Sequence, residues 1–215
     1  MVNLSAQLEK WKGAFGRAYT DRNIFSPSEL DKLYKNKFGI TRGQLNRLFL
    51  SRMNRSSRIL EVGANVGNQL AYLQKTGFKN LYGIEPQSYA RKFSKARLKG
   101  VVIDQADAFK IPFKDNFFDL VFTSGVLVHI SPKDVKKAIK EIYRCSRKYI
   151  WGLESYSPRC REVLYRGKRG LYWKADFVKL YSDMFEGLKL VRKVNLKYLD
   201  SGNVDTMFLF KKGGK

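Results

Sequence analysis

The amino-acid sequence predicts an α/β protein built on a doubly wound, mostly parallel sheet. Three observations predict this fold class. Short apolar runs alternate with segments of helical periodicity, the first run breaks into a glycine-rich loop, and the last two runs are joined by the turn 200–203. Strands that alternate with helices pair in parallel, whereas two runs joined by a short turn form an antiparallel hairpin. A chain of 215 residues is of the size of one domain.

The first 54 residues contain helical patterns and no strand pattern. Apolar residues share one face of a first helix, predicted over 4–20 and ended by a turn: Leu4, Leu8, Trp11 and Phe15. Ser28 precedes a second helix, predicted over roughly 29–37, and a third is predicted over about 41–53. We expect residues 1–54 to form an N-terminal helical cap over the mouth of a ligand site.

The remaining residues, 55–215, predict a Rossmann-like core with a seven-stranded sheet. Its strands are predicted over 57–62, 81–85, 101–104, 118–124, 148–155, 188–199 and 204–210. Helices are predicted between them over 68–76, 86–97 and 132–145, with one more after Trp173. The last two strands form a C-terminal antiparallel hairpin.

Residues 59–67 predict a buried strand that breaks into a glycine loop. Gly63 and Gly67 lack a Cβ, so the backbone can turn tightly and a ligand can come close. Asn68 is expected to cap the helix that follows, which would direct free N–H groups toward the loop. Strand, glycine loop and helix in this order are typical of a nucleotide-type cofactor site.

An acidic residue follows the second predicted strand. Glu85 lies about 20 residues past the loop, where a doubly wound sheet places an acid to accept hydrogen bonds from a ribose. From these residues alone, an NAD-binding enzyme and a plain strand-to-helix turn both remain open.

The pattern resembles the class I S-adenosylmethionine-dependent methyltransferases, whose loop reads acid-x-Gly-x-Gly-x-Gly. This chain has Glu61, Gly63, Asn65 and Gly67, so Asn65 stands at the middle glycine. Asparagine tolerates left-handed backbone better than most residues, so the departure is a tolerated one. The segments 107–108 and 125–130 favour this family over an NAD enzyme.

The resemblance implies S-adenosylmethionine as cofactor, with S-adenosylhomocysteine as its product. It places the methionine part on the glycine loop, the ribose at Glu85 and the adenine at Asp107 and Ala108, while residues 124–127 close the pocket beneath the sulfonium. Arg22 could pair with the methionyl carboxylate, although an arginine is also favoured at a helix C-terminus. The expected cofactor-binding residues are Tyr19, Arg22, Asn23, Glu61, Gly63, Asn65, Gly67, Asn68, Glu85, Pro86, Asp107, Ala108, Ser124, Gly125 and Val126.

A narrower resemblance covers nearly the whole chain. The sequence is similar to the methylases associated with pseudaminic acid biosynthesis in segments that include Trp11, 125–130, 143–146, 154–158 and 165–167. The resemblance implies a small, anionic acceptor such as a sugar or nucleotide-sugar. It does not establish the methyl acceptor itself.

Methyl transfer from a sulfonium needs an acceptor held in line and, for an amine or hydroxyl, removal of a proton. His129, the only histidine, follows the fourth strand and is either the base or a packing residue. Glu154 and Tyr156 follow at the end of the fifth strand, as an acceptor or base site or as structural hydrogen-bonding groups. Methyl transfer requires no metal, and no His/Cys/Asp cluster predicts one.

The irregular segment 157–173 is longer than a usual loop, and long loops at this edge of a sheet often bind ligands. We expect Tyr165, Arg166 and Trp173 to contact the acceptor, with Arg166 pairing with a carboxylate or phosphate. The alternative for this segment is a solvated basic loop.

The net charge of +23, from 42 basic and 19 acidic residues, attracts polyanions. It motivates two alternative functions, an RNA methyltransferase and a non-catalytic nucleic-acid-binding protein on the same scaffold; a compositional bias without a partner is the other explanation. Four basic residues recur at near-helical spacing and could form a phosphate-binding surface: Lys136, Lys140, Arg144 and Arg147. With two cysteines, no secretory leader pattern and no long apolar run, we expect a cytoplasmic protein.

Overall fold

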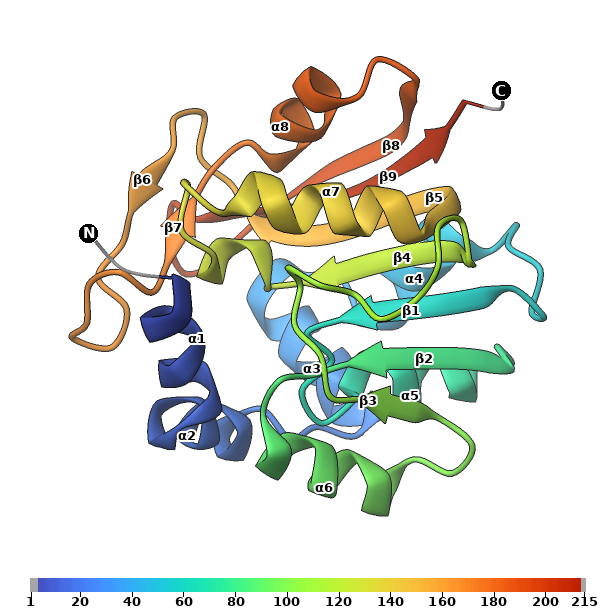
Figure 1. Cartoon of the computed structure of the whole chain (residues 1–215), viewed down its shortest axis with the longest axis horizontal. Coiled ribbons are helices and arrows are strands. Elements are labelled where there is room, and N and C mark those ends of the chain that lie inside the picture. Colours follow the sequence, from blue (N-terminus) through green and yellow to red (C-terminus); the bar gives the residue numbers. More distant parts are fainter. Residues whose placement is uncertain (1–3, 214–215) are drawn as a thin grey trace.

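The computed structural model describes residues 4–213, with side chains from residue 7 onward, and its centre is a seven-stranded sheet (Figure 1). The spatial order is β3-β2-β1-β4-β5-β9-β8. The first five strands of that order are parallel, and β9 is antiparallel to both of its neighbours. The strands are β1 (Arg58–Val62), β2 (Asn80–Ile84), β3 (Val102–Asp104), β4 (Phe118–Ser124), β5 (Ser146–Ser155), β8 (Leu188–Lys197) and β9 (Val204–Lys212). The predicted fold class is confirmed, including the C-terminal hairpin.

Helices cover both faces of this sheet. On one face lie α7 (Val135–Cys145) and α8 (Phe177–Met184); the other face packs against α4 (Arg42–Leu50) and α5 (Asn68–Lys75). Figure 1 also shows α6 (Ser88–Arg97) beside β3 and α3 (Pro27–Phe38) near α5. Because both faces are covered, the parallel strands are apolar on both sides, as their sequences predict.

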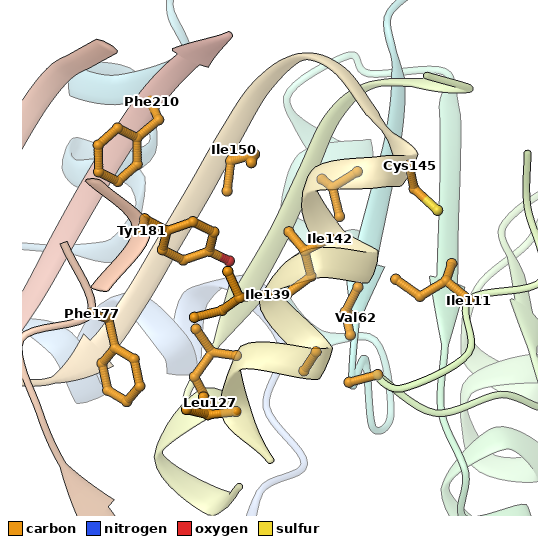
Figure 2. Packing of buried hydrophobic residues seen from close by; sticks show 14 of the residues in the cluster. Val62, Ile111, Leu127, Ile139, Ile142, Cys145, Ile150, Phe177, Tyr181 and Phe210 are labelled. Atoms are coloured by element: carbon orange, nitrogen blue, oxygen red, sulfur yellow. The ribbon is translucent and has the colours of Figure 1, made fainter. Parts of the chain in front are cut away.

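Alternate residues of each strand separate into two cores. Leu60 of β1 and Val121 of β4 join the core under α7, whereas Leu120 and Phe122 of β4 join the core under α4 and α5. Figure 2 shows Ile139 and Ile142 of α7 packed among Val62, Tyr181 and Ile150. The switch from period 3.6 in the helix to period 2 in the strands explains why these segments could be recognised from the sequence.

The first predicted helix is two helices. The chain forms α1 (Leu4–Lys12) and α2 (Ala14–Arg22), and Gly13 between them takes an extended conformation with φ −87° and ψ −157°. The prediction of one helix over 4–20 is therefore wrong at Gly13, where a residue without a Cβ weakens the helix. Trp11 and Phe15 still share a face, with ring centroids 5.2 Å apart, whereas the side chain of Leu4 lies outside the described residues.

Two helix caps differ from the prediction. Ser26, not Ser28, caps α3 in a reciprocal pair with Glu29, and Pro27 occupies its first position. Gly67, not Asn68, precedes α5 with φ +73°. Asn68 instead ties α5 to the end of α2, since its Nδ2 donates to Asn23 O at 2.6 Å and its Oδ1 accepts from Phe25 N at 3.1 Å.

Two short elements complete the carboxyl edge of the sheet. The turn after β4 contains the 3-10 helix η1 (Leu127–His129), and the segment after β5 contains a small hairpin of β6 (Arg161–Glu162) and β7 (Trp173–Lys174). In Figure 1 this hairpin and α1 lie at the end of the sheet toward which β4, β1 and β2 point. Segments far apart in the chain thus meet where doubly wound folds place their sites.

Gly16 lets the N-terminal helices dock, which gives a stability prediction. A Cβ built there would lie 1.8 Å from Trp11 O and 2.4 Å from Gln87 Nε2. We expect Gly16→Ala to lower the free energy of unfolding by about 1–3 kcal/mol, because backbone cannot move aside as a flexible side chain can. Gly187→Ala is the matched control, since nothing lies within 4 Å of its added Cβ. Equal urea midpoints for both variants would contradict this packing.

Candidate active site

A cavity of about 680 Å³ opens at the carboxyl ends of the parallel strands. Its volume falls within the range of small-molecule sites. Its walls come from α1 to α4, the loop after β1, the end of β2, the turn after β4 and the β6–β7 hairpin. Most of the predicted site residues line it: Tyr19, Arg22, Asn23, Glu61, Gly63, Asn65, Asn68, Glu85, Pro86, Asp107, Ala108, Ser124, Gly125, Val126, His129, Tyr165 and Arg166.

The loop after β1 has left-handed backbone at three alternate positions. Gly63, Asn65 and Gly67 have φ values of +71°, +49° and +73°. A Cβ at Gly63 would lie 2.7 Å from Val126 Cγ2, so only glycine allows this approach of the two loops. Asn65 adopts its conformation without glycine, and its Nδ2 donates to Thr20 Oγ1 at 3.1 Å. Gly67 is part of the loop but does not line the cavity.

Glu85 joins the end of β2 to that loop. Its two carboxylate oxygens accept the backbone N–H groups of Asn65 and Gln87, each at 2.9 Å. Burial raises the pKa of Glu85, while these two N–H groups oppose the shift. Each oxygen retains a second lone pair, so the carboxylate can still accept hydroxyl hydrogens from a ligand.

Glu61 is a buried carboxylate at the end of β1 with one oxygen unused. Its Oε2 has no hydrogen-bond partner among residues 4–213, and burial raises its pKa to about 8 although the charge of Arg42 opposes the shift. Arg42 Nη2, Asn46 Nδ2 and Gln69 Oε1 are also buried and unpaired within the described chain. Glu61, Arg42 and Gln69 line the cavity, and their unpaired atoms require an explanation, because native proteins rarely bury such atoms.

Arg42 is the main residue that the sequence prediction missed. It is 1% exposed on α4, and its Nη1 donates to Tyr34 Oη at 2.6 Å. Its ring neighbours are Tyr34 and Trp151, at 5.1 and 5.2 Å from the guanidinium carbon. A signal was present, because a cation at the first position of a helix opposes the helix dipole and needs another reason to be there.

Glu154 takes the second of its two predicted roles, that of a structural hydrogen-bonding group. It is 2% exposed and does not line the cavity; its Oε1 accepts from Val126 N at 3.1 Å and its Oε2 from Val128 N at 3.2 Å. Burial raises its pKa to about 7. Both oxygens therefore hold the turn after β4 in place, which is a supporting position and not a position that can contact an acceptor.

Two further predicted residues also lie outside the cavity lining. Tyr156 lies under Lys193 of β8, 5.4 Å from its ammonium, and Trp173 pairs with Glu162 in the β6–β7 hairpin. Their positions along the chain correctly indicated the carboxyl edge. The alternation of side chains along a strand, however, directs neighbours to opposite sides, and Ser155 and Lys174 line the cavity instead.

His129 lies in a cluster of aromatic rings that lines the cavity. Its ring centroid is 4.5 Å from that of Trp11, 5.1 Å from Tyr172, 5.2 Å from Tyr165 and 6.1 Å from Tyr19. Its Nδ1 lies 2.8 Å from Leu171 O, a carbonyl that can only accept, so Nδ1 carries the hydrogen and Nε2 a lone pair. Burial lowers its pKa to about 4, which keeps the ring neutral at pH 7.

Side-chain hydrogen bonds hold α1 and α2 against the walls of the cavity. Gln7 Nε2 donates to His129 O at 2.7 Å, and Gln87 Nε2 donates to Trp11 O at 2.7 Å. Thr20 Oγ1 donates to Gln87 Oε1 at 2.9 Å. Gln7 and Gln87 were not predicted, and nothing local in the sequence distinguishes them from surface glutamines.

Only half of the predicted basic surface is available, and Arg147 lies on β5 and not on α7. Arg144 binds Glu141 and Asp115, each at 2.8 Å, and Arg147 pairs with Asp119. Lys136 and Lys140 remain exposed. The four residues therefore do not form one open cationic surface, since two of them already hold carboxylates.

Comparison with known proteins identifies the enzyme activity. A model of a family described as a methyltransferase domain matches residues 60–149, from β1 into β5. This stretch contains the glycine loop, Glu85, Asp107 and His129. The chain is an S-adenosylmethionine-dependent methyltransferase with the Rossmann-like methyltransferase fold.

Relatives of known sequence agree with this assignment. The methyltransferase is 28% identical over 151 residues to an uncharacterised methyltransferase of Oceanobacillus iheyensis, covering 67% of this chain and 70% of the relative. It is 24% identical over 136 residues to a phosphoethanolamine N-methyltransferase of Plasmodium falciparum, covering 59% of this chain and 48% of that enzyme.

The fold is shared with solved methyltransferases. The 1,6-didemethyltoxoflavin-N1-methyltransferase of Burkholderia thailandensis, solved with 1,6-didemethyltoxoflavin and S-adenosylhomocysteine, has a TM-score of 0.72 at 14% identity over 100% of this chain and 92% of that one. A methyltransferase of Leishmania major has a TM-score of 0.71 at 18% identity, over 95% of this chain and 86% of that one. No described helix of this methyltransferase has the length and apolar composition to cross a membrane. Within residues 4–213 no group of acidic, histidine and cysteine side chains could hold a metal ion.

Proposed function

We propose that this methyltransferase, acting as one domain with residues 1–54 as its cap, methylates a small anionic acceptor such as a sugar or nucleotide-sugar. The observation that carries the proposal is one cavity with two chemically different ends. Carboxylates of Glu61 and Glu85 line it near the ends of β1 and β2, and Lys37 and Lys174 line it beside Asp205, near the ends of β5 and β9. The resemblance to the methylases associated with pseudaminic acid biosynthesis supports a sugar as the first acceptor to try.

The residues at the first end fit S-adenosylmethionine, which carries a ribose, an adenine and an amino-acid group. Glu85, followed by Pro86, would accept the ribose hydroxyls, and Asp107 with Ala108 would border the adenine. Glu61 Oε2 and Gln69 Oε1 are free acceptors for the ammonium group. The methionyl carboxylate would accept a hydrogen bond from the unused Nη2 of Arg42. Arg42 is a better candidate than the exposed Arg22, because a buried guanidinium in a low-dielectric environment binds a carboxylate more strongly.

When bound, the cofactor supplies a methyl group on a sulfonium, and the protein has to orient the acceptor and remove its proton. His129 is the candidate base. Its Nδ1–H is held by Leu171 O, and its neutral ring leaves Nε2 free to accept a proton from an acceptor hydroxyl or amine. Glu154 acts through the turn that it holds, and Trp11 and Tyr19 shield the site from water.

Replacement of His129 by asparagine tests the proton-transfer role. Asparagine retains a hydrogen-bond donor for Leu171 O but has no basic nitrogen. We expect turnover to fall by about 10²–10⁴-fold, the usual effect of losing a general base, with little change in affinity for S-adenosylmethionine. Turnover within a factor of about two of wild type in the same assay would assign His129 to packing alone.

The acceptor class is tested by following the methyl group. The protein is incubated with methyl-labelled S-adenosylmethionine and a cell extract, which is then separated into RNA, protein and acid-soluble metabolites. We expect label in acid-soluble metabolites that are retained on an anion exchanger, and nucleotide-sugars are the first pure compounds to test. Label confined to RNA would support an RNA methyltransferase instead.

A further inference from the structure

Lys174 is a buried cation without a counter-ion. It lies on β7, is 8% exposed and lines the cavity. Its Nζ donates to Asn203 Oδ1, a neutral amide oxygen, and it forms no ion pair with any carboxylate of residues 4–213. Burial lowers the pKa of Lys174, the charges of Arg161 and Lys37 lower it further, and the charge of Asp205 opposes the shift. A buried ammonium that lacks an anionic partner is destabilising unless a ligand provides one.

The nearest carboxylate is already committed to other donors. Asp205 of β9 accepts from Ser155 Oγ at 2.5 Å, from Tyr198 Oη at 3.0 Å and from Lys37 Nζ at 3.4 Å. Tyr172 Oη in turn donates to Ser155 Oγ at 2.6 Å. Asp205 therefore pairs with Lys37 and organises the two hydroxyls, and Lys174 shares the charge of this one carboxylate without forming an ion pair with it.

The charges that line this end of the cavity are unequal. Lys37 and Lys174 share a single carboxylate, Asp205, whereas three carboxylates line the cofactor end. Arg166 is exposed, with φ +48° on the β6–β7 hairpin. Two lining cations against one anion leave an excess of positive charge where an acceptor would enter.

We propose that Lys174 binds the anionic group of the methyl acceptor, a phosphate or a carboxylate, at the end of the cavity over β5 and β9. Lys37 flanks the same anion. This inference rests on the proposed function, since it takes the end of the cavity away from Glu61 and Glu85 to be the acceptor's. The anion would join three parts of the fold, which are α3, the β6–β7 hairpin and the β8–β9 turn, so acceptor binding would also close the cap.

Titration with simple anions tests this site. Wild type, Lys174→Met and Lys174→Arg are titrated with inorganic phosphate and, separately, with acetate, in the presence of saturating S-adenosylhomocysteine and at constant ionic strength. We expect Lys174→Met to weaken binding of the preferred anion by about 10–100-fold, which is the contribution of a hydrogen bond between charged groups. Lys174→Arg should retain most of the affinity for that anion. The anion that binds more tightly distinguishes a phosphate-bearing from a carboxylate-bearing acceptor.

Lys136→Met is the matched control, because it removes the same charge from the exposed face of α7. Equal weakening in both methionine variants, unchanged affinity in Lys174→Met, or no binding of either anion by wild type would overturn the proposal. S-adenosylhomocysteine affinity, measured in each variant, keeps the two hypotheses apart. If wild type does not bind S-adenosylhomocysteine, the proposed function is wrong. If Lys174→Met binds S-adenosylhomocysteine as wild type does, the variant is folded.

Discussion

Replacement of Glu85 by glutamine should weaken the binding of S-adenosylmethionine by at least about 100-fold. The carboxylate holds Asn65 N and Gln87 N at 2.9 Å and would accept two ribose hydroxyls with its remaining lone pairs. An amide keeps one oxygen and turns an NH2 group toward a backbone N–H. Two hydrogen bonds to a charged group contribute roughly 3–6 kcal/mol, which corresponds to about 10²–10⁴-fold in affinity.

The measurement is a calorimetric titration of the variant with S-adenosylhomocysteine. Glu186→Gln, which makes the same charge change at an exposed position, is its control and should bind as wild type does. Because Glu85 also holds the glycine loop, the circular dichroism spectrum of the variant is compared with that of wild type. Wild-type affinity in folded Glu85→Gln would show that the ribose is not bound at the end of β2.

Replacement of Glu61 by glutamine should have opposite effects on stability and on binding. The pKa of Glu61 is raised by burial from 4.5 to about 8, so the folded protein binds a proton more tightly than the unfolded chain does. The stabilisation that comes from this tighter proton binding is complete below pH 4.5 and is lost as the pH rises toward 8. Integration between the two pKa values gives a loss of roughly 3 kcal/mol by pH 7 in the ligand-free protein.

Glutamine at position 61 cannot ionise, so the variant does not lose stability as the pH rises. We therefore expect Glu61→Gln to raise the urea midpoint of the ligand-free protein at pH 7 and to have little effect at pH 5. The same variant should bind S-adenosylmethionine about 10–100-fold more weakly, because the carboxylate no longer pairs with the ammonium group. A pH-independent change in stability, or unchanged cofactor affinity, would contradict a role for Glu61 as the partner of the ammonium group.

Local patterns account for the parts of the structure that could be predicted. The strand limits of β4 match the prediction at both ends, and those of β1 and β2 differ by one residue, because apolar runs bounded by glycine and polar residues are read directly from the sequence. Glu85 was predictable from its distance to the loop, and it meets that loop at Asn65 N. Positions that depend on one strand, one turn and one spacing are therefore within reach of a single sequence.

Contacts between distant segments account for what was missed. Gln7 and His129 are 122 residues apart in the chain, Thr20 and Gln87 are 67 apart, and Ser155 and Asp205 are 50 apart. None of these pairs has a local signature. Glu154 was assigned to the correct edge, but the direction of a side chain at a strand end depends on register, which the sequence does not reveal.

The most direct test of the cofactor site is a calorimetric titration of the pure, cofactor-free protein with S-adenosylmethionine, with NAD as the comparison ligand. We expect saturable binding of S-adenosylmethionine at one site per chain and no binding of NAD. Binding of NAD in preference, or no binding of S-adenosylmethionine by folded protein, would contradict the assignment of the cavity between Glu61, Glu85 and Val126 as the cofactor site.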